Sequence, residues 1–213
     1  MKIGFFGDSF CCEESNQHSF AKGYSTYIRK LKVHYNAEIV NLGMGGSSYW
    51  DCIIKQFPPF IDNLPDVCIF TWTDNSRLYH NKLRNITTSV LESRSWKDIS
   101  MEVITHRSTL QAAREYFRHI HDGEKADLEQ KSAYLHFDTQ VLSKLKNTKI
   151  IHLWSFSKCY DWQNGIEIDE PLNNFVDHST EGFGKWAANH IAGDEQNQKV
   201  FELIRSNLDS YAK

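Results

Sequence analysis

The sequence has no long apolar run, no run of basic residues and no Cys-x-x-Cys motif. Its longest apolar stretches are only a handful of residues, too short for a membrane-spanning helix. The 24 basic and 27 acidic residues are intermixed along the chain and give a formal net charge of -3. This pattern argues against nucleic acid and against anionic membrane surfaces as partners.

Signals of secretion are lacking as well. The N-terminus reaches an acidic residue, Asp8, too soon for a signal peptide. The cysteines form an odd set, which is typical of reduced thiols in a cytosol rather than of a disulfide framework. They are Cys11, Cys12, Cys52, Cys68 and Cys159. We expect a cytoplasmic protein, located in the host cytosol if a virus encodes it.

No internal repeat, linker or low-complexity segment divides the chain. Its 213 residues are enough for one α/β domain with a core and too few for two comfortable ones. The ordinary apolar content and the aromatic fraction of 13% favour a globular protein over a disordered one. We expect a single domain over residues 1–213.

Four short apolar runs have the composition of buried parallel strands. They cover residues 3–7, 38–42, 67–72 and 149–154. Amphipathic stretches at 20–31 and 49–61 predict helices between them, the second disturbed by two consecutive prolines. Strands that alternate with helices predict an α/β fold, here a three-layer, flavodoxin-like parallel sheet flanked by helices.

The connection between the third and fourth strands, residues 76–147, has room for a helical insertion. Two sets of apolar residues within it show the three-and-four spacing of an amphipathic helix. One set is Leu110, Ala113, Phe117 and Ile120, and the other is Tyr134, Phe137, Val141 and Leu145. Residues 83–107 are polar and weakly periodic, which indicates a lid or a loop. An irregular segment follows the fourth strand, and a last helical part from Glu181 is broken near Gly193.

A Gly-Asp-Ser-Phe sequence at residues 7–10 ends the first predicted strand. In open α/β sheets the ligand crevice lies beyond the carboxyl ends of the strands, so a serine there would present its hydroxyl to that crevice. Glycine, aspartate and serine are also common turn residues, and a plain strand-ending turn explains the motif equally well. The motif alone leaves both interpretations open.

Two further motifs follow the second and third strands. Residues 43–48 are glycine-rich, so their backbone can aim amide groups at a developing oxyanion or cradle a phosphate. The spacing of these glycines does not match the dinucleotide-binding motif. After the third strand, Asn75 has the side-chain chemistry of an oxyanion donor, although an Asp-Asn pair also commonly begins a loop.

A fourth motif lies near the C-terminus, where Asp177 and His178 precede a helix-start pattern at Thr180 and Glu181. A histidine just before a C-terminal helix can reach back over the edge of the sheet as a general base. The chain has ten histidines, and an exposed loop position explains most of them.

In their order along the chain, these four motifs resemble the SGNH/GDSL hydrolase family. That family carries its nucleophile in a Gly-Asp-Ser block after the first strand. A glycine amide after the second strand and an asparagine after the third complete its oxyanion hole, and its histidine precedes the last helix. The resemblance implies that Ser9 is the nucleophile, that Ser9 and Gly46 supply oxyanion amides, and that His178 is the general base. Residues 76–147 have no counterpart in these motifs.

Two departures indicate a divergent member. The family's third block is usually Gly-x-Asn-Asp, and strict register places Asp74 at the donor position, where an ionised carboxylate would repel an oxyanion. Asn75 has the right chemistry one residue along. The family's acid usually lies three residues before the histidine, a position that Phe175 occupies here.

Asp177 is therefore the candidate acid of the triad. Adjacent residues on an extended chain point in opposite directions, which makes Asp177 an awkward partner for the ring of His178. Asn174, Asp169, Glu170 or a backbone carbonyl could orient the ring instead, and a Ser-His dyad is a further alternative.

Other residue pairs carry weaker signals. His119 and His121 invite a metal interpretation, but residues two apart on a helix diverge, so we expect surface residues and no metal site. Cys11 and Cys12 lie beside Ser9 and are expected to be buried or half-buried thiols rather than nucleophiles.

The resulting hypothesis is a serine esterase or deacetylase that hydrolyses a small or carbohydrate-linked acyl ester through an acyl-enzyme on Ser9, without cofactor or metal. Tryptophans near strand ends fit either a sugar-stacking surface or core packing. They are Trp50, Trp72 and Trp154. The alternatives are a non-catalytic carbohydrate-binding or assembly module on the same fold, and a phosphate-binding α/β protein. The sequence does not indicate an oligomeric state.

Overall fold

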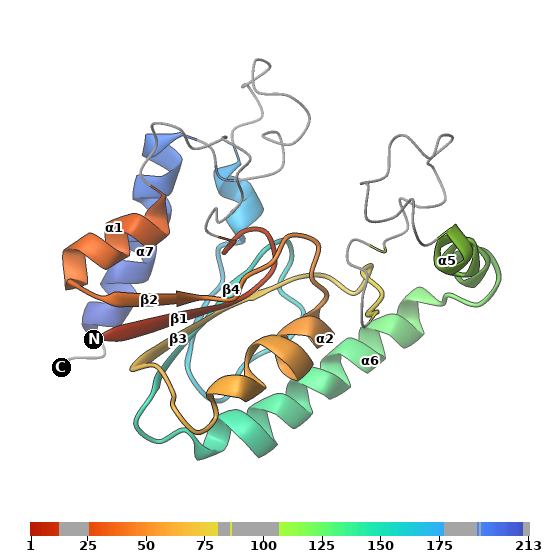
Figure 1. Cartoon of the computed structure of the whole chain (residues 1–213), viewed down its shortest axis with the longest axis horizontal. Coiled ribbons are helices and arrows are strands. Elements are labelled where there is room, and N and C mark those ends of the chain that lie inside the picture. Colours follow the sequence, from red (N-terminus) through yellow and green to blue (C-terminus); the bar gives the residue numbers. More distant parts are fainter. Residues whose placement is uncertain (13–25, 81–85, 87–106, 177–190, 192, 211–213) are drawn as a thin grey trace.

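A five-stranded parallel sheet forms the centre of the molecule (Figure 1). The computed structural model describes residues 1–12, 26–80, 86, 107–176, 191 and 193–210. The strands are β1 (Lys2–Gly7), β2 (Glu38–Asn41), β3 (Val67–Trp72), β4 (Lys149–Trp154) and β5 (Ile166–Ile168), in the spatial order β2-β1-β3-β4-β5. This is the strand order of flavodoxin-like folds, so the predicted fold class is confirmed. The segment after β4 was predicted to be irregular, which is wrong for the three residues of β5.

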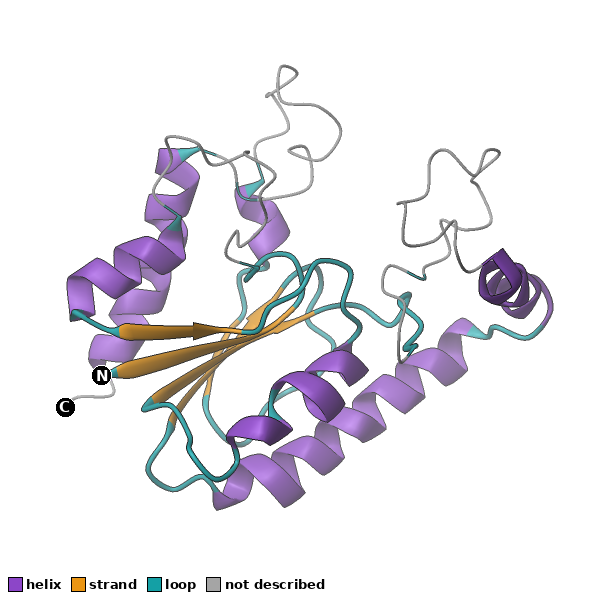
Figure 2. Ribbon diagram, in the orientation of Figure 1, coloured by secondary structure: helices purple, strands orange, loops and turns teal. Residues whose placement is uncertain are grey.

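One face of the sheet is covered by α1 (Tyr27–Tyr35) and α7 (Asp194–Ser210), which lie side by side in Figure 2. The N–H of Tyr27 donates to Asn197 Oδ1 at 2.9 Å and joins the two helices. The core beneath them is aliphatic and includes Ile3, Ile69, Ile151, Leu31, Val200 and Ile204. α7 begins at Asp194, directly after Gly193, and residues 181–190 of the last predicted helical part lie outside the described residues.

The opposite face is covered by α2 (Tyr49–Asp51) and α6 (Gly123–His136) (Figure 1). The chain continues from α2 as a π-helical segment, Cys52–Gln56, and then as a 3-10 turn, Pro58–Phe60. The prolines were predicted to disturb this helix; regular α-helix already ends at Asp51, and Pro58 begins the 3-10 turn after the π-helical segment. This core is aromatic, with Phe6, Phe57, Phe70, Trp72, Tyr134, Phe137 and Trp154 in mutual contact.

His152 lies in the middle of β4 and is fully buried in the aromatic core. Its Nδ1 accepts from the indole N–H of Trp72 at 2.9 Å, so its Nε2 carries the proton and donates to the carbonyl of Asn164 at 2.9 Å. The ring also stacks on Trp162 with a centroid distance of 4.1 Å. Burial lowers the pKa of His152 from 6.5 to about 4, so the ring is neutral.

The helical insertion between β3 and β4 comprises α5 (Arg107–His119) and α6, followed by the π-helical segment Phe137–Val141 and the 3-10 turn Leu142–Lys144. Leu110, Ala113 and Phe117 are buried on one face of α5, as predicted. Ile120 was predicted on the same face but is 66% exposed, because α5 ends one residue before it. Most of the predicted lid or loop at 83–107 lies outside the described residues, as do residues 20–25 of the first predicted helix.

None of the described helices is long and apolar enough to cross a membrane.

Candidate active site

The end of β1 depends on Gly7. Its φ is +138°, in the region that favours glycine, and a Cβ there would lie 2.1 Å from the carbonyl oxygen of Thr71 on β3. The buried Gln56 holds the peptide groups of Gly7 from the other side: Gly7 N–H donates to Gln56 Oε1 at 2.5 Å, and Gln56 Nε2 donates to Gly7 O at 2.9 Å. The chain therefore leaves the sheet at a fixed position.

Asp8, Ser9 and Phe10 form the turn that follows. The Asp8 side chain is 1% exposed and accepts from the N–H of Phe10 at 3.0 Å, while the N–H of Cys12 donates to Ser9 O at 3.3 Å. The turn interpretation is confirmed, and Ser9 is half-buried at the carboxyl edge of the sheet, while the interpretation that its hydroxyl faces a ligand crevice stays a prediction. Within the described part of the chain, neither the Ser9 hydroxyl nor its amide has a hydrogen-bond partner.

The turn after β2 runs beside this one. Met44 N–H donates to Gly7 O at 3.1 Å, and Ser47 N–H closes a turn onto Met44 O at 3.2 Å. Gly46 is the third residue of that turn and has a φ of +73°, as a type II turn requires. Asn41 joins the two loops because its side chain donates to Cys11 O at 2.8 Å and accepts from Gly43 N–H at 2.9 Å.

The amide of Gly46 is not bonded to any described residue. Two residues later the chain enters α2 through a capping box, in which Ser48 N–H donates to Asp51 Oδ2 at 2.9 Å and Asp51 N–H donates to Ser48 Oγ at 3.3 Å. The turn is thus fixed at both ends, and the amide of Gly46, a buried residue, has no partner in the described part of the chain. A glycine-rich turn with a free amide has the chemistry to bind an anion or an oxyanion.

Asp74 and Asn75, after β3, bond to other groups of the protein, whereas the buried hydroxyl of Thr73 has no partner among the described residues. Asp74 Oδ1 accepts from the N–H of Ser76 at 2.9 Å, and Asn75 Nδ2 donates to Asp127 on α6. One N–H of the Asn75 amide is thereby bonded, and the second has no partner among the described groups. The choice between Asp74 and Asn75 as oxyanion donor stays a prediction.

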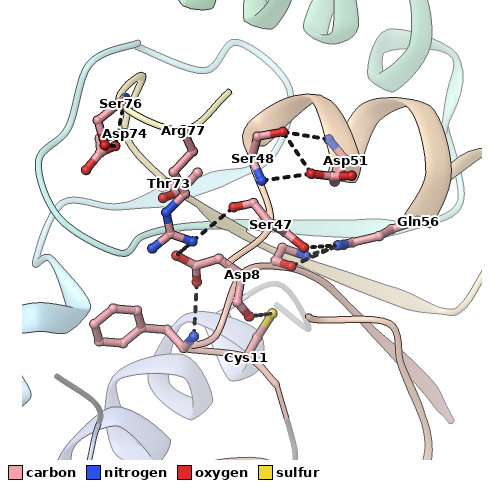
Figure 3. A network of polar contacts seen from close by, with 12 residues as sticks. Asp8, Cys11, Ser47, Ser48, Asp51, Gln56, Thr73, Asp74, Ser76 and Arg77 are labelled. Carbon is pink, nitrogen blue, oxygen red and sulfur yellow. Dashed lines mark hydrogen bonds and ion pairs between the residues drawn. The ribbon is translucent and has the colours of Figure 1, made fainter. Parts of the chain in front are cut away.

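Arg77 belongs to the site, although the sequence analysis did not single it out. Its Nη1 donates to Ser47 O at 3.0 Å and lies 3.5 Å from Asp8 Oδ2, with the side chain 12% exposed. Figure 3 shows the guanidinium between the ends of the three strands. Its guanidinium carbon is 5.8 Å from the centre of the Phe156 ring. The signal in the sequence is a cation a few residues after the third strand, at the edge where Asp8 ends the first.

The C-terminal motif is only partly visible. Asp177 and His178 lie outside the described residues. The chain leading to them is anchored: Asn173 N–H donates to Ser155 O at 3.0 Å, directly after β4, and Val176 is buried in the aliphatic core.

The alternatives for orienting His178 have other contacts. Asn174 Nδ2 donates to Glu170 Oε1 at 2.7 Å, and Asp169 pairs with Lys158 at 2.9 Å. These three acidic and amide side chains form surface interactions, since the Asp169 side chain is 76% exposed and the Asn174–Glu170 bond is also exposed.

The weaker candidates of the sequence have structural roles. Cys11 is fully buried, and burial, followed by the charge of Asp8, raises the pKa of its thiol, which opposes a thiolate nucleophile. Trp72 and Trp154 are core residues. His119 is exposed and 3.3 Å from Glu115, and the described residues contain no cluster of three or more potential metal ligands.

No family model and no curated protein matches this chain. Several solved structures are similar to it at low identity. An acetyl xylan esterase is 14% identical, with 99% of this chain and 73% of that chain covered and a TM-score of 0.35. A putative GDSL-like lipase from Parabacteroides merdae is 14% identical, with coverages of 94% and 72% and a TM-score of 0.34.

A family two carbohydrate esterase from Clostridium thermocellum, solved with cellohexaose, is also 14% identical; 99% of this chain and 64% of that chain are covered, with a TM-score of 0.39. This chain thus spans less than two thirds of that esterase.

Proposed function

We propose that this chain is a serine esterase or deacetylase that forms an acyl-enzyme on Ser9. The observation that supports it is a half-buried serine at the carboxyl edge of the sheet, on a turn that is bonded to the Gly46 turn through Met44 N–H and Gly7 O; the amides of Ser9 and Gly46 bond to no other described group. The two turns follow the neighbouring strands β1 and β2. Backbone donors held in place in this way stabilise an oxyanion without having to move during the reaction.

In the proposed reaction, Ser9 Oγ attacks the ester carbonyl carbon while the His178 imidazole takes the hydroxyl proton. The bond to the leaving alcohol breaks, the imidazolium gives its proton to that alcohol, and the acyl group stays on Ser9. Water then attacks the acyl carbon and gives a proton to the imidazole. Ser9 leaves, takes that proton back, and the carboxylic acid is released. Every proton passes through one imidazole, so the reaction balances without a cofactor.

The oxyanion of each tetrahedral intermediate would be bound by the amides of Ser9 and Gly46 and by the second N–H of Asn75. One such donor typically lowers the barrier by about 3 kcal/mol. Asn75 can keep its bond to Asp127 in this role, because a side-chain amide has two N–H groups.

The proposed role of His178 is supported by the anchor that precedes it. Val176 is buried, and its segment is bonded to the residue after β4. Two residues of extended chain span at most about 7 Å. The proposal requires that His178 reach Ser9 from the residues that follow this anchor. Because Asp169 and Asn174 have other partners, Asp177 and the backbone are the groups we propose to orient its ring.

The proposed substrate class follows from the groove between α2 and α6. It has a volume of about 730 Å³, in the usual range for small-ligand sites. Trp50, Ile53 and Leu128 give it apolar walls, and Lys125 and Glu129 give it polar ones. None of the proposed site residues lines this groove, but its walls connect to them along the chain: α2 follows the Gly46 turn, and α6 bonds Asn75 through Asp127. An aromatic face with hydrogen-bonding groups around it suits a carbohydrate-linked acyl ester.

The test is labelling and hydrolysis with the purified chain. A fluorophosphonate should label Ser9, and the protein should hydrolyse p-nitrophenyl acetate. Ser9→Ala should abolish labelling and lower kcat/KM by about three or more orders of magnitude. Ser143→Ala is the matched control, because Ser143 is half-buried with its hydroxyl bonded to Thr139 O at 2.6 Å, away from the site. Equal activity of wild type and Ser9→Ala would refute the proposal and favour the binding-module alternative.

A further inference from the structure

Arg77 connects the backbones on either side of the two proposed oxyanion amides. Its Nη1 donates to the carbonyl of Ser47, the residue after Gly46, and faces the carboxylate of Asp8, the residue before Ser9 (Figure 3). The arginine itself extends from the turn after β3. A single guanidinium therefore contacts the ends of β1 and β2 from the end of β3.

Burial of the Arg77–Asp8 pair limits how far either side chain can move. The Asp8 and Arg77 side chains are 1% and 12% exposed, and a charged group out of water must keep its partners because leaving them unpaired is costly. One nitrogen, Nη1, makes both contacts, a hydrogen bond to Ser47 O at 3.0 Å and an ion pair with Asp8 Oδ2 at 3.5 Å. A planar guanidinium is stiffer than a lysine ammonium on its flexible stem, so it links the Gly46 turn to Asp8 more rigidly.

Gln56 holds the Gly46 turn from the side opposite Arg77. Its Nε2 donates to Gly7 O at 2.9 Å and to Ser47 Oγ at 3.3 Å, from beneath the turn. Ser47 is therefore held on its side chain by Gln56 and on its carbonyl by Arg77. The amide of the preceding Gly46 is left unbonded among the described residues.

We propose that Arg77 is a positioning residue that sets the separation and direction of the Ser9 and Gly46 amides. The inference rests on the proposed esterase function. Oxyanion donors act only within a few tenths of an ångström of their hydrogen-bond distance, and a displacement of about 1 Å can cost a hundredfold in rate. Arg77 acts through the turn and does not itself contact the substrate.

The activity test compares Arg77→Met and Arg77→Lys with wild type on p-nitrophenyl acetate. Arg77→Met should lower kcat by about 10- to 100-fold and change KM by less than about threefold, because the donors act in the transition state. Arg77→Lys should fall between Arg77→Met and wild type. The rate of fluorophosphonate labelling should fall in parallel with kcat.

The matched control is Arg205→Met on α7. Arg205 also pairs with a carboxylate, Glu202 at 2.5 Å, and lies 5.7 Å from a phenylalanine ring, Phe201. It contacts neither of the two turns in the described structure, so its kcat should equal that of wild type. Loss of kcat at unchanged melting temperature separates positioning from general destabilisation.

A second measurement does not depend on catalysis. In ¹⁵N-labelled protein, Arg77→Lys should shift the backbone amide resonances of Gly46 and Ser9, and Arg205→Met should not. An active wild type with unchanged kcat in Arg77→Met, or a rise in KM alone, would overturn the positioning role. Unshifted Gly46 and Ser9 resonances would overturn it whether or not the wild type is active. An inactive wild type would by itself refute the esterase proposal.

Discussion

The turns after β1 and β2 and the turn after β3 use their polar groups in opposite ways. The first two rely on glycine backbone conformations, at Gly7 and Gly46, and leave amide donors without a partner in the described structure. The turn after β3 has no residue of positive φ at its described positions, and it acts through side chains: Asp74 and Asn75 bond within the turn and to α6, and Arg77 contacts the other two turns. Function at this edge is expected to depend on backbone groups at two strand ends and on side chains at the third.

Among the changes to the turns after β1 and β2, Gly7→Ala should destabilise the protein most. A Cβ would lie 2.1 Å from the carbonyl oxygen of Thr71, and the φ of +138° is strained for alanine. Neither β1 nor β3 can move to relieve the clash without a large loss of stability. We expect the free energy of unfolding to fall by about 4 kcal/mol or more. Urea denaturation measures the loss. Gly45→Ala, where an added Cβ has nothing within 4 Å, is the control, and an equal loss in both variants would contradict the interpretation.

The end of β3 depends instead on side chains, one of which titrates. The ring of His152 accepts from Trp72, the last residue of β3, and its pKa is lowered from 6.5 to about 4. The unfolded chain binds this proton more readily, so the contribution is complete above about pH 6.5 and is lost as the pH falls to about 4. The pKa difference corresponds to a contribution on the order of 3 kcal/mol.

Unfolding free energies of wild type and His152→Gln between pH 4 and 7 test this. The difference between the two proteins should shrink as the pH falls, while His119→Gln, at an exposed position, should leave the pH dependence unchanged. A constant difference between wild type and His152→Gln across that range would show that the buried ring is not the titrating group.

Gly46→Ala should have an intermediate effect on the second turn. Alanine at a φ of +73° costs about 1–2 kcal/mol in stability. If the turn relaxes, the amide also moves. Converted to free energy, the fall in kcat on p-nitrophenyl acetate should therefore exceed the loss in the free energy of unfolding. Circular dichroism melts and steady-state kinetics on the same preparation compare the two. An unchanged kcat would remove Gly46 from the proposed oxyanion hole.

Asn75→Ala should have the smallest effect. Because one of its N–H groups is committed to Asp127, we expect kcat to fall about tenfold, equivalent to about 1.4 kcal/mol. Asp127→Ala should cost less than Asn75→Ala. A hundredfold or larger loss of kcat in Asn75→Ala would contradict this, because the turn after β3 would then contribute as much to the reaction as the turns after β1 and β2.

The sequence predicted those parts of the fold that depend on continuous patterns. β1, β3 and β4 appeared as apolar runs because each is buried on both faces, and parallel pairing of β1 with β2 then places residues 7–9 and 43–48 at one edge. β5 was missed because it has three residues and only Ile168 is buried, too few for a period. Ile120 followed the helical spacing but lay beyond the end of α5.

The missing parts of the site depend on contacts between distant residues. Arg77 is thirty residues from Ser47 and sixty-nine from Asp8, and no local spacing indicates that these groups meet. Asn75 has the composition of an oxyanion donor, but its bond to Asp127 depends on how α6 packs. Motifs report the chemistry that a chain carries, whereas partners across the sheet follow only from its tertiary structure.

Gln56 also constrains which changes of length the chain tolerates. It satisfies both peptide groups of Gly7 from a π-helical segment, a conformation that accommodates one extra residue in a helix. Deleting a residue between 49 and 55 would restore regular helical geometry but rotate the glutamine by about 100° around the helix axis. Natural relatives should therefore vary freely in the length of surface connections, and conserve the number of residues that separates the glycine-rich turn from this glutamine.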